Sequence, residues 1–549
     1  MGLGILDPSG WQHVPGTSSI LDDNSRSQPT QGTISNLKYD RTGSVPIILV
    51  PQPTDDPNDP LNWPLWKRDV ILFILSTISV IASTLSPLLA ANTVTLSLIL
   101  ERNFTQTALL TGYHLCGVGV AGLLFVASAR VWGKRHLYLL GTLLIVISSA
   151  WGGASGRNYK SLLWARIFQG VGLAPFEALV NASVGDLYYV HERGKRMALS
   201  NLALFGGAFF TPVIVGKITH TIGWQWSFYL IAIFAGILLP LVFFFCPETT
   251  FPRPDSATTI DHELLSTSDS EPYQSAASNH NSLEKESYGA SPTNPPKVTF
   301  VQSLALFSGR KTSDSFVKLL LRPFPLLFHP AILWAMLIQG TLIGWTVMIG
   351  VELAVIFLGP PLWFTEVKTG YMYTGPFIGA LLGFAISGLL ADWSAKFMVK
   401  RNKGIYEPEF RILLVIAQLV FGCVGLYGFG AAAANVKKYG WFWPDFFFAL
   451  EVVGMVLGAV ASALYIVDAH REIAVEAFTC LLVFKNLFSF GLTWSAYDWI
   501  KTGGIARTFY IVASVQLVIC LLSVPMYIFG KKNRAFFAKH DILKMTGLS

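Results

Sequence analysis

The sequence has little charge for its length. Only 13% of the 549 residues are Asp, Glu, Lys or Arg, while 52% are hydrophobic and the mean hydropathy is +0.49. A soluble globular domain carries about twice that share of charge, so the composition excludes one. Apolar segments of about 20 residues recur, which is the length needed to cross a hydrocarbon core about 30 Å thick. The composition therefore indicates a protein that crosses a membrane many times.

Cysteine, histidine and catalytic motifs are also scarce. The five cysteines lie in or at the edge of apolar segments and show neither metal-ligand spacing nor a disulfide pattern. The ten histidines are scattered. The sequence contains no nucleophile elbow, paired metal-binding histidines or phosphate loop. We therefore expect no enzyme activity, no metal and no cofactor.

The net charge of +7 does not indicate a nucleic-acid-binding protein, because the basic residues lie in short loops between apolar spans. With both termini in the cytoplasm, inner short loops and tails carry about 17 basic residues and outer ones about 9, which satisfies the positive-inside rule. The polar stretch 1–64 does not resemble a cleavable signal peptide. A glycosylation sequon at Asn103 falls in the first predicted outer loop, which agrees with this orientation.

Twelve apolar spans in two groups of six predict an all-α polytopic membrane protein built from two six-helix halves. The first span, about Arg68–Leu98, is expected to break at Ser86–Pro87, because proline frees a backbone carbonyl there. The predicted divisions are a disordered cytoplasmic tail (1–67), an N-terminal half (68–246), a cytoplasmic linker that is first disordered and then amphipathic (247–330), a C-terminal half (331–530) and a cytoplasmic tail (531–549).

The fourth span carries two charged residues on one face. Arg166 and Glu177 are eleven positions apart, which in a helix is three turns plus about 20° and roughly 16 Å along the axis. Charged groups are costly in lipid, so both residues are expected to face the bundle interior or a hydrated cavity. This arrangement favours a protein that moves solutes across the membrane.

Further ionisable residues lie inside the second half. Glu451 and Lys485 are near mid-depth, Asn486 follows Lys485, and Glu352 lies toward the outer end of its span. Facing lipid, each charge would cost at least about 2.5–3.5 kcal/mol, so partners or water must offset that cost. Two interpretations stay open for Glu451 and Lys485, namely a buried ion pair between neighbouring helices or a substrate site.

The chain resembles the major facilitator superfamily, and more narrowly its fungal drug:proton antiporter-like branch. The resemblance rests on Arg166-x-x-Gln169-Gly170-x-Gly172 in the fourth span and on the entry sequence Asp59-Pro-Leu-Asn-Trp-Pro64. It also rests on Asp186-x-x-x-x-His191-Glu192-Arg193-Gly194 and on Pro247-Glu-Thr-Thr-Phe251. The resemblance implies a major facilitator fold of twelve helices.

Two family motifs are altered in this chain. The loop after the second span, 127–135, lacks the acidic residue of the family signature, whereas its counterpart in the second half keeps Gly388 and Asp392. The antiporter motif of the fifth span keeps Gly207, Pro212 and Gly216 but has lost two glycines between them. The changes put the direction of transport in doubt without affecting the fold.

The resemblance also implies roles for individual residues. Arg166 is expected to take part in proton coupling with Gln169 orienting it, although a hydrogen-bonded brace between helices is an alternative. Independently of the resemblance, a buried carboxylate on the face of Arg166 can load and release a proton, so Glu177, or another buried acid, is expected to carry it. Gating is assigned to Asp186, Glu192, Arg193, Gly388 and Asp392. A cavity between the halves is expected to be lined by Asn92, Glu177, Trp345, Glu352, Tyr373, Glu451, Lys485, Asn486 and Trp494.

We therefore predict a proton-coupled secondary transporter that exports a xenobiotic or secondary metabolite by alternating access. Proton-driven uptake of an organic cation such as a polyamine is the alternative, and a non-transporting sensor or scaffold is a more distant one. The expected partners are the solute, protons and the lipid bilayer, without nucleic acid. We expect a monomer in the plasma membrane, with the vacuolar membrane as the other possible location.

Overall fold

The computed structural model describes residues 3–8, 14–19, 38–40, 47–49, 51–252 and 296–548. It is helical almost throughout, and its strands form two short antiparallel pairs. β1 (Ser18–Ser19) pairs with β4 (Ile405–Tyr406), and β2 (Tyr39–Asp40) pairs with β3 (Ile47–Ile48). Most of the tail and the first part of the linker, both predicted to be disordered, lie outside the described residues.

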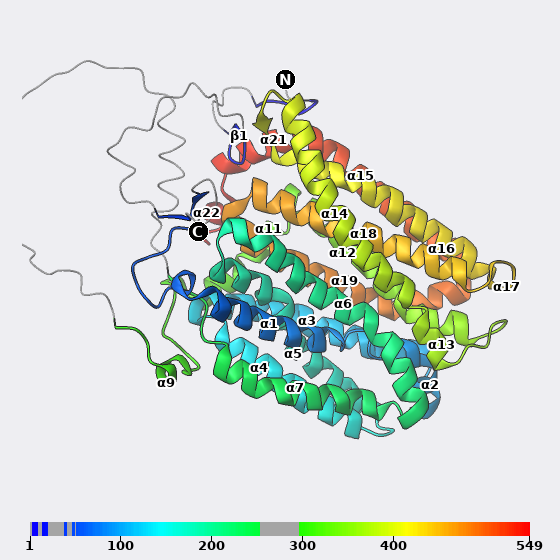
Figure 1. Ribbon diagram of the computed structural model, residues 1–549. Helices are drawn as coiled ribbons and strands as arrows, with labels where there is room; N and C mark the ends of the chain where they lie inside the picture. The colour runs from blue at the N-terminus through cyan, green and yellow to red at the C-terminus, as the bar shows by residue number, and fades with distance from the viewer. Residues whose placement is uncertain are drawn as a thin grey trace, which may run out of the picture.

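The long helices form two groups, which Figure 1 shows in its lower and upper parts. The N-terminal half contains α1 (Leu65–Ser83), α3 (Phe104–Trp132), α4 (Arg135–Ala154), α5 (Tyr159–Leu187), α6 (Val190–Ile222) and α7 (Gln225–Phe245). The C-terminal half contains α12 (Pro330–Leu358), α14 (Thr374–Arg401), α18 (Phe442–Ala469), α19 (Ala474–Gly503) and α20 (Ile505–Leu521), and a mixed helix of η3 (Pro408–Leu413), α15 (Leu414–Gln418), η4 (Leu419–Cys423) and α16 (Val424–Ala434).

Shorter helices precede, connect and follow these spans. They are η1 (Pro60–Asn62), η2 (Ala90–Asn92), α2 (Thr93–Ile99), α9 (Phe300–Ser303), α10 (Phe316–Leu321), α11 (Pro323–Leu326), α13 (Glu366–Tyr371), α17 (Val436–Tyr439), η5 (Arg471–Ile473), α21 (Ser523–Lys539) and α22 (Ile542–Met545). Among the described residues, eleven helices are long and apolar enough to cross a membrane. α1 adds a twelfth span of 19 residues whose first turns carry Lys67, Arg68 and Asp69. The predicted all-α fold of two six-helix halves is confirmed.

The predicted break in the first span is also confirmed. α1 ends at Ser83, and the chain resumes as η2 and α2. Pro87 lies in the gap between them. Proline lacks a backbone N–H and cannot continue the hydrogen-bond ladder, so carbonyls before it must find other donors. The donors come from another helix, as described below.

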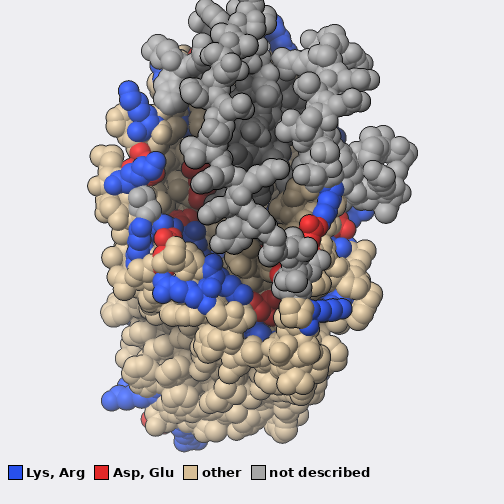
Figure 2. Space-filling view, turned by 90° about the vertical axis from the view of Figure 1, so that its left-hand side faces the viewer, with Lys and Arg blue, Asp and Glu red and all other residues tan. Residues whose placement is uncertain are grey.

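Both described chain ends lie at the same end of the bundle, which we call the inner face (Figure 1). The amide of Leu6 donates to the carbonyl of Ile528 (3.0 Å), and Arg322 Nε donates to the carbonyl of Leu548 (2.8 Å). Lys and Arg side chains gather on this face with acidic ones among them (Figure 2). This distribution agrees with the predicted cytoplasmic orientation.

At the opposite end, the outer face, the two halves are in direct contact. η2 and α2 pack against α12 and α13. Thr95 Oγ1 donates to Glu366 Oε1 at 2.6 Å. Ala90 and Phe209 of the N-terminal half belong to the same buried apolar cluster as α12 and α18 residues. The outer ends of the halves are thus joined by both apolar and polar contacts.

Residues 3–8 and 14–19, which we call the N-terminal segment, pack on the inner end of the C-terminal half. Ile5 is buried against Val399 and Phe410. Thr17 Oγ1 donates to Glu407 Oε2 at 2.7 Å, and β1 adds a strand to β4. The prediction of a disordered tail is therefore wrong for these residues, because their few apolar and polar side chains meet partners that are far away in the sequence.

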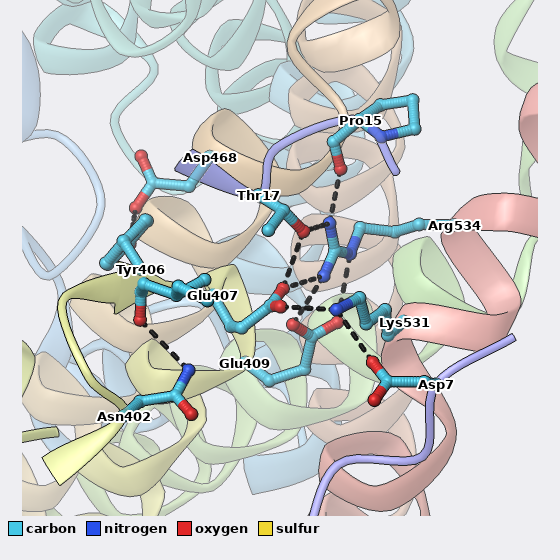
Figure 3. A network of polar contacts seen from close by, with 11 residues as sticks. Asp7, Pro15, Thr17, Asn402, Tyr406, Glu407, Glu409, Asp468, Lys531 and Arg534 are labelled. Carbon is cyan, nitrogen blue, oxygen red and sulfur yellow. Dashed lines mark hydrogen bonds and ion pairs between the residues drawn. The ribbon is translucent and has the colours of Figure 1, made fainter. Parts of the chain in front are cut away.

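The N-terminal segment is held by a buried charge network (Figure 3). The Arg534 side chain, 1% exposed, donates to Glu409 Oε1 (3.0 Å) and Glu407 Oε2 (2.9 Å) and to the carbonyl of Pro15. Lys531 Nζ contacts Glu407 (2.6 Å) and Asp7 (2.8 Å). The hydrogen bond from Lys531 lowers the pKa of Asp7 below its usual value. Three acids, Asp7, Glu407 and Glu409, thus share two bases, Lys531 and Arg534, beneath the segment.

Arg534→Met is expected to destabilise the protein by about 3–5 kcal/mol, because removing one member of a buried ion pair leaves its partners without compensation. The thermal unfolding midpoint of the purified protein should fall, and proteases should cut within the N-terminal segment sooner. Lys532→Met is the matched control, since Lys532 is an exposed neighbour on the same helix. Equal unfolding midpoints for the two variants would contradict the stabilising role assigned to Arg534.

Candidate functional site

An ion pair joins the two halves inside the bundle. Lys485 Nζ on α19 contacts Glu177 Oε1 on α5, and the side chains are 13% and 12% exposed. Glu177 lies ten residues before the inner end of α5 and Lys485 eleven residues after the inner end of α19. At a rise of about 1.5 Å per residue, both are about 15 Å from the inner face. The sequence predicted both residues as cavity residues, but it did not predict that they pair with each other.

Polar residues missed by the sequence analysis continue this site toward the inner face. Asn181 lies one turn after Glu177 on the same face of α5. Its amide nitrogen donates to Asn201 Oδ1 (2.8 Å), and its amide oxygen accepts from Ser200 Oγ (2.7 Å). In the sequence, the signal that could have identified Asn181 was its spacing of four residues from Glu177, which places both on one face of a helix. The site is therefore a polar track on α5 and α6 rather than a single carboxylate.

Arg166 has a different environment from Glu177. It is fully buried and donates to the carbonyls of Leu85 (2.7 Å), Ser86 (3.4 Å) and Leu110 (3.3 Å). Two of these acceptors immediately precede Pro87. Arg166 therefore supplies the donors that the break in the first span requires, which is the bracing alternative considered above. Its role in proton coupling stays a prediction.

Gln169 does contact Arg166, as predicted. Its Oε1 accepts from an Arg166 terminal nitrogen at 2.9 Å, and its Nε2 donates to Ser149 Oγ on α4 at 3.2 Å. The backbone carbonyl of Arg166 lies 3.3 Å from His114 Nδ1 on α3. The family motif in α5 thus ties α5 to the first span, α3 and α4 in the outer part of the N-terminal half.

Two further acids are sealed within the C-terminal half. Glu451 is fully buried, and its Oε1 accepts from Thr346 Oγ1 at 2.8 Å. Glu352 is also fully buried, and in the described part of the chain neither of its carboxylate oxygens has a hydrogen-bond partner. An ion pair between Glu451 and Lys485 is excluded as an interpretation, since Lys485 reaches across to Glu177 instead.

The remaining predicted cavity residues serve packing. Asn92 Nδ2 donates to Thr219 Oγ1 (2.6 Å) near the outer face, and Asn486 Nδ2 donates to the carbonyl of Leu482 (3.0 Å). Trp345 Nε1 donates to Gln516 Oε1 (3.2 Å), and the Tyr373 hydroxyl donates to the carbonyl of Gly350 (2.7 Å). Both aromatic residues belong to the core of the C-terminal half. The prediction that they line a cavity is not supported.

The structure does not place Trp494 in the cavity that it was predicted to line. Its side chain is 57% exposed, whereas Ser489 and Ala496 on the same helix are buried. Nine residues separate Trp494 from Lys485, and at about 100° per residue this places the two on opposite faces of α19. Trp494 therefore lies on the outside of the bundle, not in the cavity.

The predicted gating residues pair within the N-terminal half. Asp186 contacts Lys134 Nζ (2.5 Å), Glu192 contacts Arg68 (3.3 Å), and Arg193 donates to the carbonyl of Gly185 (2.6 Å). In the second half, Asp392 is exposed and Gly388 has open space where a side chain would be. These contacts differ from the predicted gate, because they do not bring the two halves together.

A charge contact between the halves at the inner face involves other residues. Arg130, at the end of α3, contacts Glu476 in the first turn of α19. Arg322 of the linker lies 3.7 Å from Glu476 and 3.1 Å from Asp314. The linker is also held by the thiol of Cys480, which donates to the carbonyl of Pro323 at 3.2 Å. The second part of the linker therefore packs on both halves, with Leu319 buried against α3.

Glu248 provides a carboxylate beside the loop 127–135, which lacks the acidic residue of the family signature. Its carboxylate accepts from the backbone amides of Lys134 (3.0 Å) and Arg135 (3.1 Å) at the start of α4. An anion at a helix N-terminus satisfies free N–H groups and the helix dipole. Gly133 makes room for it, since a Cβ there would lie 2.2 Å from Glu248 Oε2.

The altered motif of the fifth span is a packing motif in α6. A Cβ at Gly207 would lie 2.2 Å from Ser83 Oγ on α1, and one at Gly216 would lie 2.5 Å from the carbonyl of Glu366 on α13. Gly370 of α13 similarly faces the carbonyl of Pro212.

Asn103 is exposed, and its side chain caps α3 by accepting from the amide of Gln106 (2.8 Å). Glycosylation there stays a prediction.

Gly170→Ala is expected to lower the stability of the folded protein, because a Cβ at this position would lie 2.0 Å from the backbone carbonyl oxygen of His114. Backbone cannot yield as a side-chain tip can, so overpacking of about 1–3 kcal/mol is expected. Thermal unfolding of purified protein measures the loss. Gly185→Ala, in the same helix but with no atom within 4 Å of its Cβ, is the control and should be neutral or stabilising.

Two helical halves with an ion pair between them define a polytopic membrane protein with the architecture of a transporter. The sequence matches the family model of the Major Facilitator Superfamily over residues 71–479. The chain belongs to the Major Facilitator Superfamily.

Its relatives include fungal transporters of this family. The chain is 25% identical to protein HOL1 of Saccharomyces cerevisiae, with 95% of each chain aligned. It is 24% identical to a multidrug transporter of Candida glabrata, over 86% of this chain and 76% of that one. A solved D-xylose–proton symporter superposes with a TM-score of 0.57 at 14% identity, covering 85% of this chain and 99% of that chain. At this low sequence identity, the similarity to the symporter structure shows the fold alone.

Proposed function

We propose that this protein is a proton-coupled secondary transporter that exports a small organic molecule, a xenobiotic or secondary metabolite, by alternating access. The observation that carries the proposal is the Glu177–Lys485 ion pair, which links α5 of one half to α19 of the other. A titratable contact between two moving bodies is what a proton needs in order to bias their arrangement. Similarity to the multidrug transporter of Candida glabrata supports export.

The proposed cycle uses the ion pair as its switch. With Glu177 ionised, attraction to Lys485 holds α5 against α19. A proton on Glu177 removes that attraction and leaves the ammonium of Lys485 without its counter-charge, so the halves separate more easily. A proton can shift this equilibrium only because the two arrangements bind it differently. Asn181, Asn201 and Ser200 offer hydrogen bonds to a solute on the inner side of the pair.

Uptake of an organic cation is less well supported. That alternative relied on three intramembrane glutamates attracting a positive charge and on the altered motif of the fifth span. Lys485 neutralises Glu177, and Glu352 and Glu451 are fully buried. The central site therefore has no excess negative charge to select a cation over a neutral solute.

The test is a solute-dependent proton flux. Purified protein in liposomes with an imposed pH gradient should transport candidate drugs and secondary metabolites, with proton movement in the opposite direction reported by an internal pH dye. Dissipating the gradient with a protonophore should stop accumulation. Solute and protons moving in the same direction would overturn export, and transport indifferent to the pH gradient would overturn proton coupling.

A further inference from the structure

A serine in the second part of the linker has the setting of a modification site. Residues 305–315, between α9 and α10, form neither helix nor strand, and residues 305–310 are all exposed. Ser313 is exposed within this stretch at the inner face. A protein kinase needs an accessible segment outside helices and strands as its substrate. Here the kinase must also displace one backbone contact, since the amide of Lys311 donates to the carbonyl of Val131 on α3 (2.8 Å).

The residues before Ser313 provide the charge pattern for recognition. Arg310 and Lys311 stand three and two positions before it, and kinases select substrates by such charge patterns. Arg310 donates to three backbone carbonyls of its own loop, those of Thr312 (2.8 Å), Ser313 (3.5 Å) and Asp314. Because these contacts are local and solvent-exposed, a kinase can displace them at little cost.

The residue after Ser313 begins a chain of charges that reaches both halves. Asp314 pairs with Arg322 (3.1 Å), Arg322 lies 3.7 Å from Glu476, and Glu476 contacts Arg130. These residues belong to the linker, to α19 and to α3. A new charge beside Asp314 therefore acts on the attachment of the linker to the C-terminal half.

We propose that Ser313 is a phosphorylation site and that its phosphate draws Arg322 away from Glu476, loosening the linker from the start of α19. In the transfer step, the Ser313 hydroxyl oxygen forms a bond to the γ-phosphorus of ATP while the bond from that phosphorus to the β–γ bridging oxygen breaks. ADP leaves, and the hydroxyl proton passes to the kinase base.

The direction of the effect follows from charge. The phosphate carries about −1.5 to −2 at neutral pH and accepts strong hydrogen bonds from guanidinium groups. Glu476 carries a single charge and already has Arg130 as a partner. Arg322 is thus drawn to the phosphate, while Arg130 remains on Glu476 and keeps the two halves in contact.

Cys480 provides a built-in reporter of this release. Its thiol is fully buried and donates to the carbonyl of Pro323, the residue next to Arg322. When Arg322 leaves Glu476, α11 is less firmly held, and Cys480 becomes accessible to a thiol reagent. Cys423 lies in the core of the C-terminal half and provides an internal reference that should not change.

The experiment treats the purified full-length protein with ATP and a basic-directed serine kinase of the cyclic-AMP-dependent class, followed by maleimide labelling and peptide mass spectrometry. Phosphate should appear on Ser313, remain in Ser315→Ala and be lost in Ser313→Ala. Labelling of Cys480 should rise about threefold or more in the phosphorylated protein, given the strength of arginine–phosphate pairing. Arg322→Gln should raise it without kinase.

Two results would overturn the proposal. The first is failure of the kinase to modify Ser313, whether or not it modifies a free peptide of residues 305–318. The second is a phosphorylated protein in which Cys480 labelling matches the untreated sample. Neither readout depends on transport, so the outcome is independent of the proposed function.

Discussion

Glu177→Gln abolishes coupled transport, by at least about a hundredfold in rate, if the ion pair at the centre of the bundle is the proton switch. Glutamine keeps the shape of glutamate but cannot take up or release a proton. Lys485 is then left as a charge with little access to water, and breaking a buried pair in this way costs about 3–5 kcal/mol. Solute-driven proton flux in liposomes measures the loss directly.

A charge swap distinguishes the pair from its individual members. Lys485→Met should be as damaging as Glu177→Gln, whereas the double variant Glu177→Lys with Lys485→Glu should recover part of the activity because attraction between α5 and α19 is restored. Asp498→Asn, an exposed change on the same helix, is the control. Full coupled transport by Glu177→Gln would exclude this carboxylate as the proton carrier.

Arg166→Met is expected to prevent stable folding rather than to uncouple transport. The guanidinium satisfies the carbonyls of Leu85 and Ser86 at the break in the first span, and methionine would leave them buried without donors. Each unsatisfied group costs about 1–3 kcal/mol, so the loss approaches the total stability of a typical domain. Detergent-solubilised protein should aggregate or melt many degrees lower.

The bracing and coupling interpretations of Arg166 make different predictions for Arg166→Lys. Lysine keeps the positive charge but has three donors on one atom and lacks the planar fork that reaches several carbonyls at once. A brace therefore predicts a lowered melting temperature with proton coupling retained in the molecules that fold. A normal melting temperature with solute movement that no longer requires a pH gradient would show that the charge itself serves coupling.

The fold could be predicted because its main signals are local in sequence. Each span can be recognised from the length of its run of apolar residues, and the break near Pro87 follows from a missing backbone donor. The face shared by Arg166 and Glu177 follows from helix geometry alone. Trp494 was assigned wrongly although the same geometry, applied from Lys485, places it on the opposite face of its helix.

Partners between helices could not be predicted in the same way. Glu177 and Lys485 are 308 positions apart, and Glu407 and Arg534 are 127 apart. No periodicity connects such pairs, because their proximity depends on how the helices rotate and pack. For this reason the inner gate was predicted at residues such as Asp186 and Glu192, whereas a charge contact between the halves at the inner face lies at Arg130 and Glu476.

The sequence by itself determined that this protein crosses the membrane twelve times in two halves, since hydrophobic length and charge placement act residue by residue on each span. Only the tertiary structure decided which charges meet. It paired Glu177 with Lys485, assigned Arg166 to the break in the first span, placed Glu248 at the start of α4 and joined the N-terminal segment to Arg534. Buried charges must find partners wherever packing places them, and packing is a property of the whole chain.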